Sequence, residues 1–376
     1  MADADVRFTD IDLGAADGTD RTFTATAVFG VGFAALVALF CYDYWINPDI
    51  VAFRQFDWPL AATVLFLVVY ALVPLVHHPR LAKEGFLRLA GDSRTLASFL
   101  FLLVAFGIGL FGPLVYSQPE VHIRFAHQPP VGLTVPMDLV NRCLGPVANG
   151  RCFGTWQFPL GTAYGGFDVL VWLVHGLRVV VAVALVSGLV VAGVGTAVGA
   201  LAGYAGGRVD DLLMRYVDAQ QVIPAFLVYV VLRLVFEGSL FALVFIFGLL
   251  NWGGTARLVR SETRSVAESG YVTAARAAGA SRFGVVRSHV VPNVAGGALT
   301  SATNRVGTLV LAEASLSFLA LGPPQAHSLG RLAAIGLGSL RTYPWVSTIP
   351  VLLLAAVALA LGVVGEGVRA AFDPRV

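Results

Sequence analysis

The sequence predicts an all-α membrane protein that crosses the bilayer several times. Of its residues 57% are hydrophobic and 13% are charged, whereas soluble domains carry about 25% charged residues. A series of apolar runs supports the same class, because most are close to the roughly 20 residues that a helix needs to span a bilayer. The net charge of +2 indicates neither a nucleic-acid partner nor an acidic one.

The N-terminal part predicts a short acidic tail followed by two spans. Residues 1–23 are rich in Asp and lack the basic region of a cleavable signal peptide, so the first apolar run is expected to remain as an anchor. Spans are predicted at residues 24–45 and 59–77. The segment from there to residue 95 is basic and is therefore expected in the cytoplasm, together with the N-terminus; its cations are Arg80, Lys83, Arg88 and Arg94.

A third span at residues 96–116 leads into an external segment that ends at residue 167. This segment is polar and contains Cys143 and Cys152. Their spacing allows a small loop closed by a disulfide, which an oxidising exterior would preserve. The alternative is a pair of free thiols.

Residues 168–204 form an apolar helical stretch that is too long for one perpendicular span. We expect residues 168–178 to lie in the outer interface and the remainder to cross the membrane. Gly195, Gly199 and Gly203 share one face and allow close packing against another helix. A polar cytoplasmic turn at 206–215 and spans at 220–236 and 239–252 follow, and Arg233 and Glu237 are spaced to pair on a helix.

The longest polar interruption of the C-terminal half is a cytoplasmic loop at residues 253–296. Within it, alanines predict a short helix, which Gly279 can end in the left-handed conformation. Ser281 can then cap a second helix, and Pro292 marks its end or a kink. Small side chains allow a partner's surface to approach the first helix, although a solvated loop is the alternative. Spans at 298–320 and 345–365 bring the total to about eight, with a cytoplasmic C-terminus.

The segment around this joint resembles the EAA loop of permease subunits in ABC importers. Ala274, Ala275, Gly279 and Pro292 match that motif, whereas Thr273 stands where the family has an acidic residue. In the family this loop is the coupling helix that sits in a groove of the ATPase. The resemblance therefore implies a set of residues that couple the chain to an ATPase: Tyr271, Thr273, Ala274, Ala275, Arg276, Gly279 and Arg282.

The resemblance extends, in order, over residues 158–376 and is strongest to dipeptide and oligopeptide permeases. It includes residues 203–207 with Asp210 and Asp211, residues 256–260, residues 313–319 and residues 365–367. It implies the transmembrane fold of type I ABC importers, with a core of about six spans, preceded here by two additional ones. Departures at residues 158–163 and 328–330 fall on the external side, where a binding protein docks.

This resemblance implies a plasma-membrane permease subunit that forms half of a translocation path for di- or oligopeptides or a similar small solute. Its partners would be a second permease subunit, two ABC ATPases and an external solute-binding protein. The chain has no GxxxxGK[ST] phosphate loop, so ATP would be bound by the partners. We expect no cofactor and no metal site, because no Cys/His spacing indicates one.

Two other classes compete with this interpretation. An enzyme would need clustered nucleophiles, paired carboxylates or metal-spaced His within the membrane, and the sequence shows none. A secondary transporter or channel would need no coupling loop and would depend on intramembrane charges such as Arg233, Glu237 and Glu313. Glu313 should in either case face the interior of the bundle, as a structural contact or as a gate that lines the path.

Overall fold

The computed structural model describes residues 15–45, 57–77, 79, 83, 85, 91–236 and 238–372, nearly all of them helical. The chain divides into two compact units, Met1–Glu84 and Gly85–Val376. The basic segment between residues 78 and 90 falls largely outside the described residues, as does Glu237, so the predicted pair of Arg233 and Glu237 falls outside them as well.

The N-terminal unit is a pair of apolar helices. The first is α1 (Ala15–Trp45), which begins inside the stretch predicted as an acidic tail; the second consists of α2 (Asp57–Leu67), a π-helical turn η2 (Val68–Leu72) and α3 (Val73–His77). Phe29 packs edge-on against Phe66 with ring centroids 5.8 Å apart. Residues Ala25–Asp43 and Asp57–His77 are long and apolar enough to cross a membrane, as the sequence predicts.

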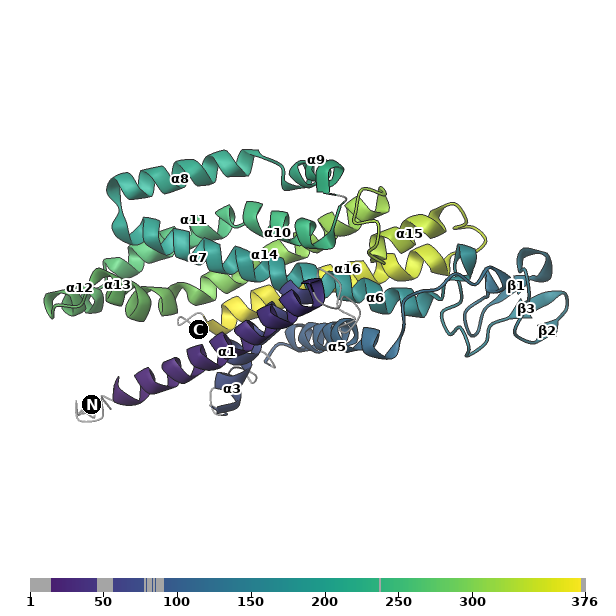
Figure 1. Cartoon of the computed structure of the whole chain (residues 1–376), viewed down its shortest axis with the longest axis horizontal. Coiled ribbons are helices and arrows are strands. Elements are labelled where there is room, and N and C mark those ends of the chain that lie inside the picture. The colour runs from purple at the N-terminus through teal and green to yellow at the C-terminus, as the bar shows by residue number, and fades with distance from the viewer. Residues whose placement is uncertain are drawn as a thin grey trace, which may run out of the picture. The chain divides into compact units, whose positions relative to one another are not determined.

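Long helices that lie side by side form the second unit (Figure 1). They are α5 (Ser93–Val115), α6 (Val169–Ala182) continued by the π-helical turn η6 (Val183–Ser187) and α7 (Gly188–Ala205), α10 (Leu240–Leu250), α11 (Gly253–Ala267), α14 (Val291–Phe318) and α16 (Trp345–Phe372).

The most extensive helix contact in this unit is between α7 and α11. A Cβ atom on Gly199 would lie 2.5 Å from the carbonyl oxygen of Ala256, and one on Gly203 would lie 2.7 Å from that of Arg260. Gly195 likewise faces Thr255. The predicted role of these glycines is confirmed, since any side chain would force the two backbones apart.

Shorter helices complete the unit at its ends and along one side. They are α8 (Gly207–Val222), α9 (Ala225–Phe236), α12 (Gly270–Ala277), α13 (Arg282–Val285) with the π-helical turn η7 (Val286–Val290), and α15 (Leu329–Leu337). The axes of α8 and α9 differ by 69°. The break falls at Ile223 and Pro224, because proline lacks a backbone donor and disfavours helical geometry in the residue before it.

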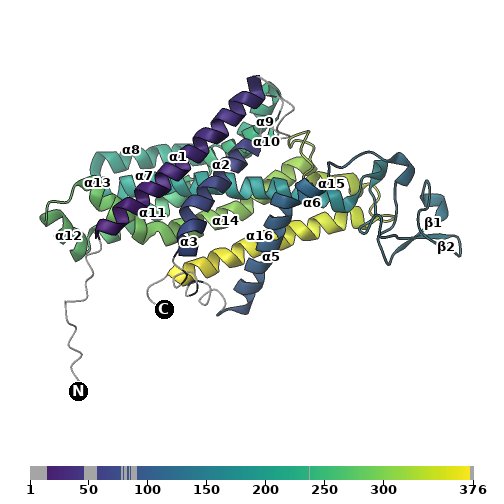
Figure 2. The same ribbon diagram turned by 60° about the horizontal axis from the view of Figure 1, so that its bottom comes forward.

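A small antiparallel sheet lies at the opposite end of the unit from α12 and α13 (Figures 1 and 2). Its strands β1 (Thr134–Pro136), β2 (Val147–Ala148) and β3 (Arg151–Phe153) are ordered β1-β3-β2, with short 3₁₀ turns η3 (Ile123–Phe125), η4 (Met137–Leu139) and η5 (Tyr164–Gly166) nearby in the chain. Cys143 and Cys152 form a disulfide. The segment expected as an external loop is thus a folded element.

The structure moves several predicted boundaries. By length and composition, six helices among the described residues can cross a membrane, or seven if the bent pair α8–α9 counts as one span. Residues 168–178 are no separate interfacial helix, since Val169–Ala205 is one apolar helix of 37 residues. The predicted turn at 206–215 is wrong because α8 begins at Gly207.

The predicted spans at 220–236, 239–252 and 298–320 also change. The first is only the second arm of the bent pair, and the second continues through α11 as one helix, Leu240–Ala267. Consequently the loop predicted from residue 253 begins only after Ala267. The third corresponds to α14, which has 28 residues but too many polar side chains to pass the same test.

Candidate functional site

The joint between α12 and α13 has the geometry that its sequence predicts. Gly279 adopts φ = 90°, and the amides of Gly279 and Ala280 donate to the carbonyl oxygens of Arg276 and Ala275, which is the Schellman ending of a helix. Ser281 Oγ then accepts a hydrogen bond of 3.1 Å from Gly284 N at the start of α13. Both predicted caps are confirmed.

One face of α12 is anchored and the other is presented outward. Val272 is fully buried in an apolar cluster with residues of α7, α11, α13, η7 and α14: Ala200, Val259, Val285, Val290, Val294 and Ala298. Ala275 is half-buried, and the remaining predicted coupling residues are exposed: Tyr271, Thr273, Ala274, Arg276, Gly279 and Arg282. This exposed face consists of alanines between cations and has few bulky groups.

Thr273 supplies no charge at the position where the resemblance expects an acidic residue. Its hydroxyl donates to the carbonyl oxygen of Ser269, the residue immediately before α12, at 3.3 Å. Contact with a partner would therefore depend on shape and on Arg276 and Arg282 more than on an acidic side chain.

Of the three predicted intramembrane charges, the structure describes Glu313 and Arg233, whereas Glu237 lies outside the described residues. Glu313 is 1% exposed, accepts a hydrogen bond of 2.6 Å from Ser317 Oγ and also interacts with the Ser328 side chain at the start of α15. Arg233 donates to the carbonyl oxygen of Ala320 at 2.8 Å. Glu313 thus lies in the packing between α14 and α15, which is the position expected of a structural contact.

The sequence did not predict a buried ion pair that joins α8 to α11. The Asp210 side chain is 3% exposed and accepts from Arg260 Nε at 2.5 Å, from Arg260 Nη2 at 2.6 Å and from Arg264 Nη2. The spacing of Arg260 and Arg264 on one face of a helix was available in the sequence. Their partner, 50 residues before Arg260 and 54 before Arg264, was not.

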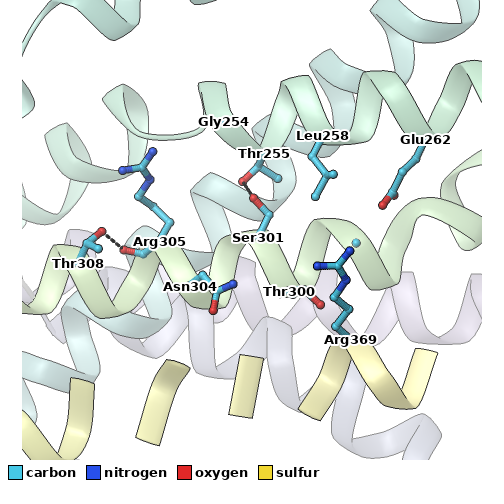
Figure 3. A pocket seen from close by; sticks show the side chains of 11 residues that line it. Gly254, Thr255, Leu258, Glu262, Thr300, Ser301, Asn304, Arg305, Thr308 and Arg369 are labelled. Carbon is cyan, nitrogen blue, oxygen red and sulfur yellow. Dashed lines mark hydrogen bonds between the residues drawn. The ribbon is translucent and has the colours of Figure 1, made fainter. Parts of the chain in front are cut away.

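A groove of about 380 Å³, with a lining that is more apolar than polar, lies between α11, α14 and α16 (Figure 3). Hydroxyl and amide groups occupy its middle, where Thr255 Oγ1 and Ser301 Oγ are hydrogen-bonded at 2.9 Å. Charged groups lie toward its ends. Its polar lining consists of Thr255, Glu262, Thr300, Ser301, Asn304, Arg305, Thr308 and Arg369. The sequence signal for this groove was Arg305, a cation inside a predicted span.

The sheet end of the unit is held by an aromatic stack. The rings of His127 and Tyr343 are parallel, with centroids 4.0 Å apart, and Tyr343 Oη donates to the carbonyl oxygen of Leu139 at 2.6 Å. Burial lowers the pKa of His127, because a desolvated imidazole resists protonation.

Comparison with known proteins supports the resemblance of the helical core to permease subunits. Residues 195–376 match the family described as binding-protein-dependent transport system inner membrane component. The oligopeptide transport system permease protein OppC of Mycobacterium tuberculosis (strain H37Rv) is 34% identical over 298 residues, which cover 78% of this chain and 94% of the relative. The chain belongs to this permease family.

Other relatives have similar names. The OppC protein of Bacillus subtilis is 26% identical over 78% of this chain and 89% of its own length. The dipeptide transport system permease protein DppC of Lactococcus lactis is 32% identical over 58% of this chain and 64% of its own length. The chain is therefore a multi-pass permease of the inner membrane, and the predicted fold class is confirmed.

Proposed function

We propose that this permease forms one half of the translocation path of an ABC importer for di- or oligopeptides. The observation that carries the proposal is the α12–α13 joint, with its two caps and its outward face of small side chains. Such a face fits a groove on a partner. The solute class is supported by the relatives, whose names describe oligopeptide and dipeptide transport systems.

The joint would lie in the cytoplasm and the sheet outside. The joint and the preceding α11 are rich in Arg, including Arg257, Arg264, Arg276 and Arg282, which favours the cytoplasmic side. The disulfide of the opposite end suits an oxidising exterior. Both termini would be cytoplasmic.

The proposed assembly contains a second, similar permease, two ATPase subunits that bind and hydrolyse ATP, and an external solute-binding protein. The absence of a phosphate-loop sequence supports a separate ATPase. A secondary transporter would instead import without an ATPase and stop when the ion gradient collapses, which gives a direct contrast.

Two substitutions at the joint test the proposal in the assembled importer, reconstituted with its binding protein. Ala275→Asp places a charge in a close contact, and Gly279→Leu puts a side chain at a left-handed position. Both should assemble normally but lose solute-stimulated ATP hydrolysis. Ser265→Asp adds the same charge at an exposed site on α11, and this variant should keep solute-stimulated ATP hydrolysis. Normal stimulation in both joint variants would refute the coupling role.

A further inference from the structure

Arg305 is placed where an unpaired charge is costly. It is near the midpoint of α14 (Val291–Phe318), and its side chain is exposed at the surface of the isolated chain. Within the part of the chain that the structure describes, no ion pair or hydrogen bond engages its guanidinium. A cation at this depth must face water or a polar partner, because lipid would not solvate it.

The groove around Arg305 has the volume of a small-molecule binding site. A Cβ on Gly254 would lie at an ordinary contact distance of 3.5 Å from Arg305 Nη2, so α11 passes directly beside the guanidinium. Ser301, Asn304 and Thr308 lie on the same face of α14 and line the same groove. Its volume of about 380 Å³ falls in the range of small-molecule sites, about 300–1,000 Å³.

Charges are distributed unevenly along the groove. At its far end Glu262 lies against Gly297, with Arg369 extending toward it (Figure 3). Gly297 and Arg305 are eight residues apart on one helix, which is a rise of about 12 Å. The groove is lined by two cations, Arg305 and Arg369, and one carboxylate, Glu262, so it carries an excess positive charge, and Arg305 lies at the end away from Glu262.

We propose that this groove is a binding position for a carboxylate of the solute as it crosses the membrane. Arg305 would pair with the carboxylate, as its planar guanidinium suits that group, and the neighbouring hydroxyl and amide groups would bind the polar backbone of a peptide. This inference rests on the proposed importer function and adds a chemical preference to the permease itself. Thr255, Ser301, Thr300 and Thr308 already make hydrogen bonds within the chain. An apolar helix of a partner would nevertheless leave the Arg305 guanidinium without a counter-charge, which favours an anionic occupant.

The first test compares uptake of trialanine and trialanine amide by the complete importer, in the native chain and in Arg305→Gln. The binding protein is the same in both, so any change in the ratio of the two rates belongs to the permease. We expect the native preference for the free carboxylate to fall about tenfold, as for loss of a charged hydrogen bond. Leu311→Gln, on the exposed face of α14 beyond the groove, should leave the ratio unchanged.

An unchanged ratio in Arg305→Gln, with ATP-driven uptake intact, would overturn the inference and leave the proposed function standing. Absence of ATP-driven uptake in the native complex would instead refute the proposed function. An anionic lipid head group is the other source of the same chemistry. If Arg305 binds such a head group, uptake of both peptides would fall equally when phosphatidylglycerol is replaced by phosphatidylcholine. That result would show that Arg305 does not bind the carboxylate of the solute.

A second measurement needs no transported solute. In a Cys41→Ser background, Asn304→Cys is reacted with an anionic and a cationic methanethiosulfonate reagent. The preference for the anionic reagent should be about tenfold higher with Arg305 than with Arg305→Gln, and Leu311→Cys should show no such difference. Equal ratios with and without Arg305 would show that the groove does not attract anions and would overturn the proposal.

Discussion

Asp210 should hold α8 to α11, and Asp210→Asn tests this by removing the charge while keeping the size. The carboxylate is buried and accepts three hydrogen bonds from Arg260 and Arg264. Loss of a buried ion-pair partner costs about 3–5 kcal/mol. Both guanidiniums remain partly accessible to water, so we expect a smaller cost, about 2 kcal/mol.

The assay is hydrogen exchange of the α8 amides in the assembled protein. A cost of about 2 kcal/mol should accelerate exchange about thirtyfold. Asp218→Asn is the matched control, since Asp218 is 65% exposed and pairs with Arg257 between the same two helices. An exposed pair contributes about 0–1 kcal/mol, so its loss should change exchange less than about fivefold. Equal effects of the two variants would show that burial of Asp210 is not what stabilises α8.

Three further outcomes are expected. Cys143 and Cys152 should resist a membrane-impermeant maleimide added from outside until a reductant is present; labelling without reductant would contradict the bridge. Burial lowers the pKa of His127 below its ordinary value of about 6.5, so the unfolded segment binds the proton more readily than the folded one. The sheet end should therefore lose stability as the pH falls below that value. Comparing the rates of proteolysis at pH 7.5 and 5.5 measures this loss, and His127→Phe should abolish the difference between the two rates. Glu313→Gln should keep uptake within about twofold because the amide still accepts from Ser317; loss of uptake with normal assembly would show that Glu313 acts through its charge.

Local geometry is what the sequence predicted best. Gly279 and Ser281 end and begin helices through contacts within a few residues, and Gly199 faces a neighbour because no other residue type would fit. The pairing of Cys143 with Cys152 was likewise available from their spacing. Each of these features depends on few distant partners.

The features that sequence reasoning missed depend on residues far away in the chain. Asp210 makes α8 look like a polar turn until Arg260 and Arg264 are seen to neutralise it. Average hydropathy hides the role of α14, because the polar residues around Arg305 line a groove while the opposite face packs against other helices. Buried or groove-lining polar side chains cannot be told from solvated ones without the neighbouring elements.

The apolar cluster around Val272 has a mechanical consequence for the whole helical unit. It joins α12 to α7 through Ala200, to α11 through Val259 and to α14 through Val294 and Ala298. A close-packed interior is nearly incompressible, so a displacement imposed on α12 cannot be absorbed locally. The displacement is instead transmitted to α7, α11 and α14. Of these helices, α14 contains Arg305, about two turns beyond Ala298. A displacement of α12 would therefore also shift the part of α14 that lines the groove.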